Sequence, residues 1–531
     1  MTIDHDVIIA GGGPVGMGLA IELGQRGVRV CVVERHAQPQ PIPKGQNLTQ
    51  RTMEHMKAWG VEAEVRAACP IPAEQGFGGM TCHGSLVSEF HYDWLDRRHV
   101  AAFYHAANAR LPQYETERVL RARVAELETV MVLYGRKVTG LVQDAESVTV
   151  AVSGGEPAQV TGRYLVGCDG SRSVVREAAG IVQTKRDHDR LMVLLVFRSE
   201  GLHDLLARYP GKSFFNVLQA GMGGYWQFFG RVDGNRNWFF HAPVPMGTTA
   251  DNYDFVDLLH RAAGAEFDVV FQHVGFWDLR IAIAENYRKG RVFVAGDAAH
   301  SHPPYGGYGI NTGFEDARNL GWKLAAVCAG TAGDGILDTY DEERRPVFES
   351  TARDFIEKSI FEDAAFLASH DPEPDPDAFA QAWAARGAGT PGEVDAFEPN
   401  YEGSSLVSGS GHPSAVGTHV FKARAGHHLP PRRVADGRPV TDVLGTSYTL
   451  IVFGASERDL GDIRQATRNF PLGASIVSFP AEGEVLDYGA RAILVRPDGF
   501  VAWTGDASEA AGWLRSSHTA QDAAPVVAAA D

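Results

Sequence analysis

Cysteine is scarce in this chain, and its pattern argues against two kinds of chemistry. The 5 cysteines among 531 residues are an odd number, and no Cys-x-x-Cys pair occurs. We therefore expect neither a disulfide framework nor a structural zinc site, and we predict a reduced, cytoplasmic protein without a bound metal. Because no cysteine follows Cys328, the last part of the chain cannot carry out dithiol chemistry.

Positive charge and long apolar runs are also lacking. The net charge is -17 and no basic stripe is visible, which argues against nucleic acid and against an anionic membrane surface as partners. No apolar run reaches the length of a membrane span, and the first residues enter a strand directly, so we expect no signal peptide. The length predicts about three or four domains, and 44% hydrophobic residues suffice for their cores.

A glycine-rich turn follows the first predicted strand. Residues 7–16 read Val-Ile-Ile-Ala-Gly-Gly-Gly-Pro-Val-Gly, and a helix is expected from Met17 to Arg26. Gly11 and Gly13 allow a tight turn in which backbone N–H groups approach a pyrophosphate, and Gly16 lets the helix pack closely on the strand. The alternative is a strand-turn-helix in which these glycines serve packing only.

An acidic residue ends the second predicted strand, Val28–Val33. Glu34 lies about 20 residues after the glycine turn, where a carboxylate can accept both ribose hydroxyls of an adenine nucleotide. An acid at this position disfavours a 2′-phosphate. The bound dinucleotide is therefore predicted to be FAD or NAD rather than NADP.

Changes in the pattern of apolar and polar residues divide the chain into four segments. Residues 1–181 alternate strands and helices, with one helix expected at Gln113–Val124. Residues 182–285 carry short alternating runs of apolar and aromatic residues that predict an inserted antiparallel sheet. Residues 286–398 return to the first domain and continue into long helices, one of them expected from Leu337 to Phe361, with a surface linker expected at 370–377. A further unit occupies 399–531, and its alanine-rich tail is expected to fray.

Two further motifs strengthen the dinucleotide reading. Asp169 follows a buried strand in the run Cys-Asp-Gly-Ser-Arg-Ser, where its carboxylate can accept backbone N–H groups. Asp297 ends another strand, and the glycine-rich run 303–313 leads from it into a helix expected at Asn311–Ala329. The positive end of that helix can stabilise the anion that forms on a reduced flavin.

These three motifs have the order and spacing of a known family. Over about residues 5–365 the chain resembles the single-component flavin-dependent aromatic hydroxylases of the p-hydroxybenzoate hydroxylase type. Its length and C-terminal unit resemble the phenol, hydroxyphenylpropionate and polyketide hydroxylase branch. The resemblance implies an α/β fold with a Rossmann-type FAD-binding domain, an inserted antiparallel β-sheet substrate domain and a C-terminal thioredoxin-like domain without redox cysteines.

The resemblance also implies a set of FAD contacts. They are Gly11, Gly13, Pro14, Val15, Gly16, Glu34, Arg35, Lys44, Gln113, Asp169, Asp297, Pro304, Gly307, Gly309, Ile310 and Asn311. Lys44 stands where the family usually has an arginine near the pyrophosphate, which keeps the charge but loses the planar fork. Tyr308 and Ile310 stand where the family often has glutamine and methionine.

The implied reaction has two halves. NADH or NADPH reduces FAD, and the reduced flavin captures dioxygen as a C4a-hydroperoxide that hydroxylates a phenolic or related aromatic substrate. By resemblance, Pro304 lies beside the flavin and could offer its carbonyl to the hydroperoxide. Tyr225, Gln227 and Arg231 share one face of a predicted strand, so Tyr225 and Arg231 are catalytic candidates if that face points inward, and an exterior polar face if it does not.

For several other polar residues the sequence allows two roles. Gln46 and Asn47 are either polar pocket residues or helix caps. His300 and His302 suggest metal or acid–base chemistry, but no third ligand is evident, and by resemblance His300 is structural. The expected partners are a small aromatic substrate and, for the oligomeric state, a homodimer.

The sequence is also compatible, to different degrees, with other functions. Within the same fold the alternative is a Baeyer–Villiger or epoxidising oxygenase acting on a polyketide-type polycyclic substrate. A flavin halogenase lacks support because Trp-x-Trp-x-Ile-Pro is absent. A disulfide reductase or NAD(P)H dehydrogenase would need a second glycine fingerprint, and Gly221–Gly224 lacks the following helix. A non-catalytic flavin-binding protein would not need the whole loop 303–313.

Overall fold

A mostly parallel sheet forms the first domain. The computed structural model describes residues 3–76 and 78–516, and the chain's buried apolar strands assemble in it as the sequence predicts. Its parallel strands, in spatial order, are β17 (Val292–Val294), β10 (Gln159–Gly167), β1 (His5–Ala10), β2 (Val30–Glu34) and β7 (Val130–Tyr134). Three antiparallel strands extend it, namely β16 (Arg288–Lys289), β9 (Val148–Ser153) and β8 (Lys137–Gln143).

Helices pack on this sheet and on one another. They are α1 (Pro14–Gly24), α2 (Gln50–Ala58), α3 (Glu62–Ala67), α4 (Gln113–Val124), α5 (Val174–Ala178) and α8 (Tyr308–Cys328). The helix predicted at Gln113–Val124 has these bounds in the structure. By contrast, α8 begins three residues before the predicted Asn311, because Gly307 takes a left-handed φ of 71° and starts the helix there.

A second sheet, here called the mixed sheet, is larger than the segment predicted for it. Its strands are β18 (His300–Ser301), β15 (Val270–Ala284), β11 (Gln183–Arg198), β14 (Asn237–Val244), β13 (Trp226–Arg231), β12 (Phe214–Leu218), β4 (Gly79–His83) and β5 (His91–Trp94). The first strand and the last two come from outside 182–285, and β4 pairs with β12 in parallel. Met80 and Cys82 of β4 lie in the same buried cluster as Phe215 and Val217 of β12, which explains this pairing.

One face of the mixed sheet is covered by α6 (Gly201–Leu205) and α7 (Phe255–Ala263), which bury their apolar residues in that same cluster. The opposite face, here called the inner face, packs toward the parallel-sheet domain. A two-stranded ladder of β3 (Asn47–Leu48) and β6 (Ala109–Arg110) belongs to the same side of the molecule. The inner face is therefore the side on which the two domains meet.

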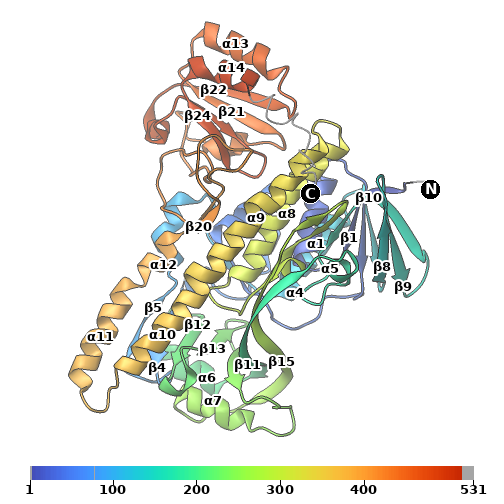
Figure 1. Ribbon diagram of the computed structural model, residues 1–531. Coiled ribbons are helices and arrows are strands. Elements are labelled where there is room, and N and C mark those ends of the chain that lie inside the picture. The colour runs from blue at the N-terminus through green and yellow to red at the C-terminus, as the bar shows by residue number, and fades with distance from the viewer. Residues whose placement is uncertain (1–2, 77, 517–531) are drawn as a thin grey trace, which may run out of the picture.

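Long helices run along the body of the molecule (Figure 1). The helix predicted from Leu337 to Phe361 is α9 (Thr339–Ser350), a π-helical turn at 351–357, and α10 (Lys358–Ser369) in direct continuation. The predicted linker at 370–377 is short, because Asp375 caps α11 (Pro376–Gly389) and Pro376 occupies its first turn. Then α12 (Pro391–Ala396) follows.

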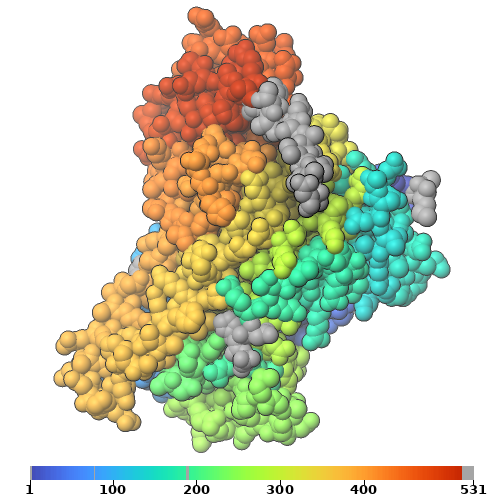
Figure 2. All heavy atoms as spheres, in the orientation of Figure 1, coloured from blue at the N-terminus to red at the C-terminus, as the bar shows by residue number. Residues whose placement is uncertain are grey.

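The C-terminal unit has a βαβ–ββα order. Its strands are β21 (Tyr448–Phe453), β22 (Ala474–Phe479), β23 (Ala492–Val495) and β24 (Val501–Gly505), and its helices are α13 (Glu457–Thr467) and α14 (Ala507–Ser516). This order is thioredoxin-like, as expected. A short pair, β19 (Phe397–Asn400) and β20 (Ser414–Val416), precedes it. The unit forms a lobe at one end of the molecule (Figure 2). The tail expected to fray from 519 lies outside the described residues.

Among the residues that the structure describes, no helix combines the length and the apolar character needed to cross a bilayer. The five cysteines are free thiols.

Buried charges join the C-terminal unit to the first domain. The Glu343 carboxylate on α9 accepts hydrogen bonds from Arg496 (2.5 and 2.9 Å) and from Lys323 Nζ on α8 (2.7 Å). Arg496 also pairs with Asp498 at 2.6 Å, and all four side chains are fully buried. Although burial opposes ionisation, Arg496 and Lys323 hold the pKa of Glu343 well below its usual range.

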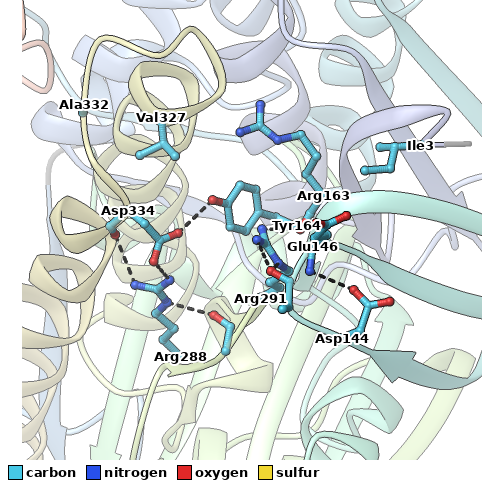
Figure 3. Close-up of a pocket in the computed structure, with 12 residues that line it drawn as sticks. Ile3, Asp144, Glu146, Arg163, Tyr164, Arg288, Arg291, Val327, Ala332 and Asp334 are labelled. Atoms are coloured by element: carbon cyan, nitrogen blue, oxygen red, sulfur yellow. Dashed lines mark hydrogen bonds and ion pairs between the residues drawn. The ribbon is translucent and has the colours of Figure 1, made fainter. Parts of the chain in front are cut away.

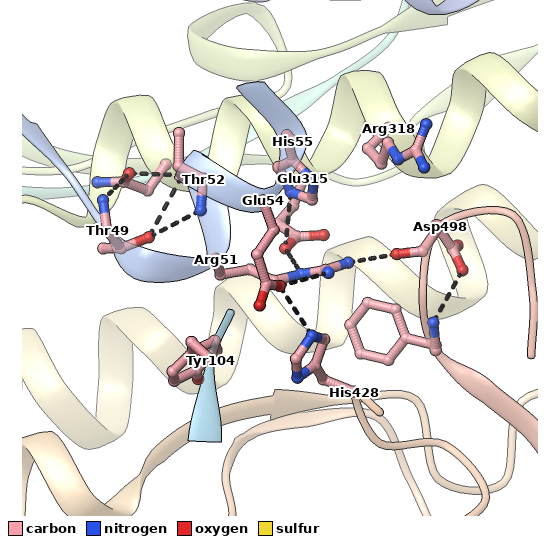
Figure 4. A network of polar contacts seen from close by, with 12 residues as sticks. Thr49, Arg51, Thr52, Glu54, His55, Tyr104, Glu315, Arg318, His428 and Asp498 are labelled. Carbon is pink, nitrogen blue, oxygen red and sulfur yellow. Dashed lines mark hydrogen bonds and ion pairs between the residues drawn. The ribbon is translucent and has the colours of Figure 1, made fainter. Parts of the chain in front are cut away.

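A second polar network lies beside it (Figure 4). Arg51 Nε donates to Glu315 Oε1 at 2.7 Å, and its Nη2 donates to the Asp498 carbonyl of the C-terminal unit. Glu54 on the same helix pairs with His428 at 2.8 Å. Together the two networks place residues of the C-terminal unit against α2, α8 and α9, so this unit is docked onto the first domain.

We predict that Glu343→Ala lowers the free energy of unfolding by about 3–5 kcal/mol, because it leaves two buried cations short of a partner. Thermal and urea unfolding of the purified proteins measure this. The matched control is Glu342→Ala, whose carboxylate accepts the Ser405 N–H at 2.8 Å near the surface. Equal unfolding midpoints for the two variants would show that the buried cluster is not what holds the unit in place.

Candidate functional site

The three predicted motifs converge at the carboxyl ends of the parallel strands. A Cβ added to Gly11 would lie 2.3 Å from the Cys168 carbonyl oxygen, and one added to Gly16 would lie 1.9 Å from the Gly11 carbonyl oxygen. Val15 packs under the third motif, since a Cβ on Gly296 would lie 2.9 Å from its Cγ2. The glycines therefore allow backbone segments far apart in sequence to touch.

Gly13 differs from these packing glycines. A Cβ added to it would meet nothing within 4 Å, and its φ of -73° is one that any residue adopts. It precedes Pro14 at the start of α1, where backbone N–H groups and the positive end of the helix face outward. This open cradle fits a pyrophosphate, and Glu34 lies beside it, fixed by N–H groups of Gly12 and His36 at 2.6 Å each.

Two aspartates line the same region. Asp169 Oδ2 accepts the Val175 N–H at 3.1 Å, while its Oδ1 is buried without a partner among the described residues. Burial raises the pKa of this carboxyl. Asp297 lies at the end of β17 with an exposed side chain. An orphaned buried oxygen and an exposed carboxylate at adjacent strand ends fit the hydroxyl groups of a dinucleotide.

The loop 303–307 and the start of α8 form the far side of this region. The Asn311 side chain braces them: its Nδ2 donates to the Asn47 carbonyl at 2.8 Å and its Oδ1 accepts the Thr49 N–H at 2.9 Å. Gly309 and Ile310 occupy the first turn of α8, partly exposed, after Pro304 and Gly307. The first N–H groups of α8 are thus available to a flat ring.

The remaining predicted cofactor residues lie on neighbouring loops. Gln113 Oε1 accepts the Gly45 N–H at 3.3 Å, and a Cβ on Gly45 would lie 3.3 Å from Ile310. Lys44 is therefore brought near Ile310 and the start of α8, with its side chain exposed. Arg35 is exposed after β2 and donates to His36 at 3.0 Å. The contacts of Gly45 bring the loop at 44–45 and the start of α4 beside Ile310 of α8.

Of the three polar residues predicted to share a strand face, Gln227 and Arg231 lie in β13 and Tyr225 lies just outside it. Tyr225 precedes β13 and packs near Trp226, with the Arg190 guanidinium 5.4 Å from its ring. Arg231 lies on the face covered by α6: its Nη1 bonds His203 Nδ1 at 2.8 Å and its guanidinium lies 4.4 Å from the Trp238 ring. Arg231 therefore points toward the layer of α6 and α7 and away from Pro304.

Gln227 likewise lies opposite Val217, which belongs to the cluster under α6 and α7. Gln227 and Arg231 therefore share a face of β13, but that face is covered by α6 and α7 and is neither inward-pointing nor exterior. Their alternation is disrupted where β13 begins, since Tyr225 follows the left-handed Gly224 and stands outside the strand.

The inner face carries aromatic rings together with polar atoms that have no protein partner. Phe214, Phe228 and Phe239 pack ring to ring at 5.6–5.9 Å, and Tyr305 of the loop lies 5.2 Å from Trp226. Among the described residues, the buried polar atoms left unpaired here are Gln46 Oε1 and Nε2, Arg110 Nε and Nη2, Asn216 Oδ1 and His241 Nδ1. Native proteins rarely leave such atoms unpaired, so this face is suited to a polar aromatic ligand.

The two histidines of the third motif pack on the ring of Phe348 in α9, and the Nε2 atom of His302 is buried without a hydrogen-bond partner among the described residues. His300 Nε2 bonds Asp316 Oδ2 at 2.6 Å and stacks on Phe348 at 4.2 Å. His302 Nδ1 bonds the Pro303 carbonyl, and burial lowers its pKa to about 4. No group of three potential metal ligands occurs in the described part of the chain.

A separate surface pocket lies away from the three motifs (Figure 3). Arg163, Tyr164, Arg288, Arg291 and Asp334 line it. Its charges are satisfied internally: Arg288 pairs with Asp334 and Asp338, and Arg291 donates to backbone carbonyls. None of the predicted site residues lines this pocket.

Comparison with known proteins decides the family. A family model described as FAD binding domain matches residues 4–354, and one described as aromatic-ring hydroxylase, C-terminal, matches residues 422–524. The chain belongs to the FAD-dependent aromatic-ring hydroxylases. It is accordingly a flavoprotein monooxygenase, as its motifs indicated.

Three relatives of this hydroxylase illustrate the likeness. A 4-methyl-5-nitrocatechol 5-monooxygenase of a Burkholderia species is 32% identical, with 94% of each chain covered. A 12-dehydrotetracycline 5-monooxygenase/anhydrotetracycline 6-monooxygenase of Streptomyces rimosus is 32% identical over 94% of this chain and 95% of that one. The solved aklavinone-11 hydroxylase, in complex with FAD and aklavinone, is 26% identical, with a TM-score of 0.79 over 98% and 100% of the chains.

Sequence reasoning missed three polar residues of this hydroxylase's inner face. Arg110 lies three residues before Gln113, and Asn216 and His241 interrupt the apolar strands Phe214–Leu218 and Asn237–Val244. A polar residue inside an otherwise apolar strand was the available signal. It went unused because alternation alone does not say which face is inward.

We predict that Asp297→Ala yields folded hydroxylase that has lost most of its FAD. The carboxylate stands exposed at the end of β17, where only the cofactor would use it. Flavin absorbance per mole of purified protein measures the loss, with Asp338→Ala, which removes an exposed carboxylate paired with Arg288, as control. A fully yellow Asp297→Ala protein would exclude this role.

A sharper test uses Gly13→Ala. Because a Cβ has free space there, the variant should unfold at the wild-type temperature yet bind FAD about tenfold more weakly, equivalent to about 1.4 kcal/mol. Gly140→Ala, also without a close neighbour, should change neither property. FAD titration that finds equal affinity for Gly13→Ala and wild type would place the pyrophosphate elsewhere.

Proposed function

We propose that this protein is an FAD-dependent, NAD(P)H-consuming monooxygenase that hydroxylates a phenolic or related aromatic substrate. The observation that carries the proposal is the inner face, where buried unpaired polar atoms stand among aromatic rings opposite the loop 303–307. When bound, FAD supplies electron transfer from NADH or NADPH and the activation of dioxygen. The chain would orient the cofactor and substrate, exclude water from the site and supply charged groups.

Each part of the cofactor has residues suited to hold it. The cradle at Gly13 with Lys44 nearby would hold the pyrophosphate, and Glu34 would face the adenosine ribose. Asp297 and the orphaned Asp169 Oδ1 would meet hydroxyl groups along the cofactor. The first turn of α8 would direct its positive end at the flavin ring, where it favours an anion.

On the substrate side, the loop 303–307 closes against the mixed sheet. Tyr305 contacts both Trp226 and Trp94, and Arg97 Nη2 donates to the Gly306 carbonyl at 3.0 Å. These contacts fix the loop, so the Pro304 backbone is held between the cofactor side and the inner face. A fixed position of this kind would help to keep water away from the reacting atoms.

The alternative is oxygen insertion or epoxidation on a polyketide-type polycyclic substrate. Two of the three relatives named above, a tetracycline-type and an aklavinone enzyme, favour a polycyclic ring system, whereas the third is named for a nitrocatechol, which has a single ring. They do not separate hydroxylation from ring oxygenation. We propose hydroxylation because the inner face offers hydrogen-bonding groups suited to a phenolic oxygen.

We further propose that the protein works in the reducing cytoplasm, supported by its five free thiols. The homodimer stays a prediction.

The proposed function predicts that a suitable phenol accelerates NADH or NADPH oxidation. A panel of hydroxyanthraquinones, with unsubstituted anthraquinone as the non-phenolic control, is added to the FAD-loaded protein, and loss of nicotinamide absorbance is followed. At least one phenol should raise the rate by about tenfold, equivalent to about 1.4 kcal/mol of barrier. A rate that no ring compound changes, with hydrogen peroxide as the sole oxygen product, would favour a simple flavin oxidase.

A further inference from the structure

Arg110 spans the two sides of the site. Its backbone pairs with Asn47 in the β3–β6 ladder, and the Asn47 carbonyl accepts Asn311 Nδ2 at the start of α8. Its guanidinium carbon lies 4.7 Å from the centre of the Phe214 ring on the inner face. The residue thus begins beside the elements that would hold the flavin and reaches the sheet that faces them.

The charge of Arg110 is buried without compensation. The residue is 5% exposed, its Nε and Nη2 have no hydrogen-bond partner, and no ion pair forms with it among the described residues. Arg344 and Arg496, which are also buried, pair with Asp316 and Glu343. Arg231 and Arg97 have no carboxylate partner among the described residues, but Arg231 Nη1 bonds His203 Nδ1 at 2.8 Å and Arg97 Nη2 donates to the Gly306 carbonyl at 3.0 Å. Burial alone lowers the pKa of Arg110 to about 9. An unpaired buried cation destabilises a fold, so its presence indicates a ligand that pairs with it.

Neutral polar groups surround the same place. Gln46 adjoins Arg110, because its carbonyl accepts the N–H of Leu111 at 3.1 Å, and its side-chain amide is buried and unpaired. Asn216 and His241 lie in one row of the inner face, each registered against Phe228. Burial lowers the pKa of His241 to about 4, so this ring is neutral at physiological pH. A flat ring between these groups would meet one cation and several neutral hydrogen-bonding atoms.

We propose that Arg110 binds an ionised oxygen of the aromatic substrate, with the Gln46 amide beside it and Asn216 and His241 recognising other polar groups of the ring system. The substrate class is therefore an acidic aromatic compound whose phenol, enol or carboxyl group binds as the anion. This inference deepens the proposed monooxygenase function and rests on it. An ionised phenol is also the more electron-rich ring, which suits attack by an electrophilic oxygen.

Arg110 and Arg231 are the natural pair for a test. Both are buried arginines without a carboxylate partner among the described residues, and they lie on opposite sides of the mixed sheet. The probe is alizarin, a dihydroxyanthraquinone whose phenolate absorbs at longer wavelength than its phenol. It is titrated into the FAD-loaded wild type and variants at a pH where free alizarin is mostly neutral.

Wild type should bind alizarin as the phenolate and show the long-wavelength band. Arg110→Gln should weaken binding by about tenfold or more and leave the probe neutral, as expected for loss of a charge-assisted hydrogen bond. Arg110→Lys should retain part of the band. Arg231→Gln should behave as wild type toward the probe, and unsubstituted anthraquinone should bind wild type and Arg110→Gln alike.

Stability separates a binding role from a structural one. Because Arg110→Met removes an uncompensated buried charge, its unfolding temperature should equal or exceed that of wild type, with FAD content unchanged. A lower unfolding temperature together with equal loss of alizarin and anthraquinone binding would overturn the proposal. So would an unchanged phenolate band in Arg110→Gln, loss of the band in Arg231→Gln instead, or no phenolate band in wild type.

The binding readout is independent of turnover. If no oxygenated product forms but the phenolate band depends on Arg110, then Arg110 binds the ionised oxygen and the proposed monooxygenase function is wrong. If products form without a phenolate band, the monooxygenase function is supported and the proposed role of Arg110 is wrong.

Discussion

The geometry of the site depends on one buried carboxylate, Asp316 of α8. Its Oδ2 accepts the Gly296 N–H at 2.9 Å and His300 Nε2 at 2.6 Å, and its Oδ1 accepts Arg344 Nε at 2.8 Å. Although burial opposes ionisation, His300 and Arg344 hold the pKa of Asp316 below its ordinary value. Because Asp316 holds the end of β17 against α8 and α9, it fixes the segment that carries Asp297 relative to the helix that begins at the loop 303–307.

Each domain contributes a different part of the site. The parallel-sheet domain supplies a cradle of packing glycines with one open position at Gly13, and the mixed sheet supplies an aromatic wall. The C-terminal unit docks through paired buried charges around Glu343. The buried charges of this docking cluster are paired, whereas Arg110 forms no ion pair among the described residues and lies where a substrate is expected.

Much of this architecture could be predicted from local sequence. The glycine turn, the acid at Glu34 and the helix at Gln113–Val124 are signals carried within a few residues, and the structure has each of those elements in place. The full extent of the mixed sheet could not be predicted, because β4 pairs with β12 across more than a hundred residues, between Met80 and Phe215. The inward face of β13 was also beyond prediction, since alternation defines two faces without saying which is covered by α6 and α7. Arg231 was therefore predicted as a pocket residue although it lies under α6. Arg110 was not predicted, because its two-residue strand β6 gives no alternation pattern.

The most direct test of monooxygenase function is the fate of molecular oxygen. The FAD-loaded protein, NADH or NADPH and the phenol that best stimulates nicotinamide oxidation are incubated under isotopically labelled dioxygen, and the products are analysed by mass spectrometry. The account predicts one labelled oxygen atom per product molecule, carried as a new hydroxyl group on an intact ring. Unlabelled aromatic compound with all of the label recovered as hydrogen peroxide would contradict it.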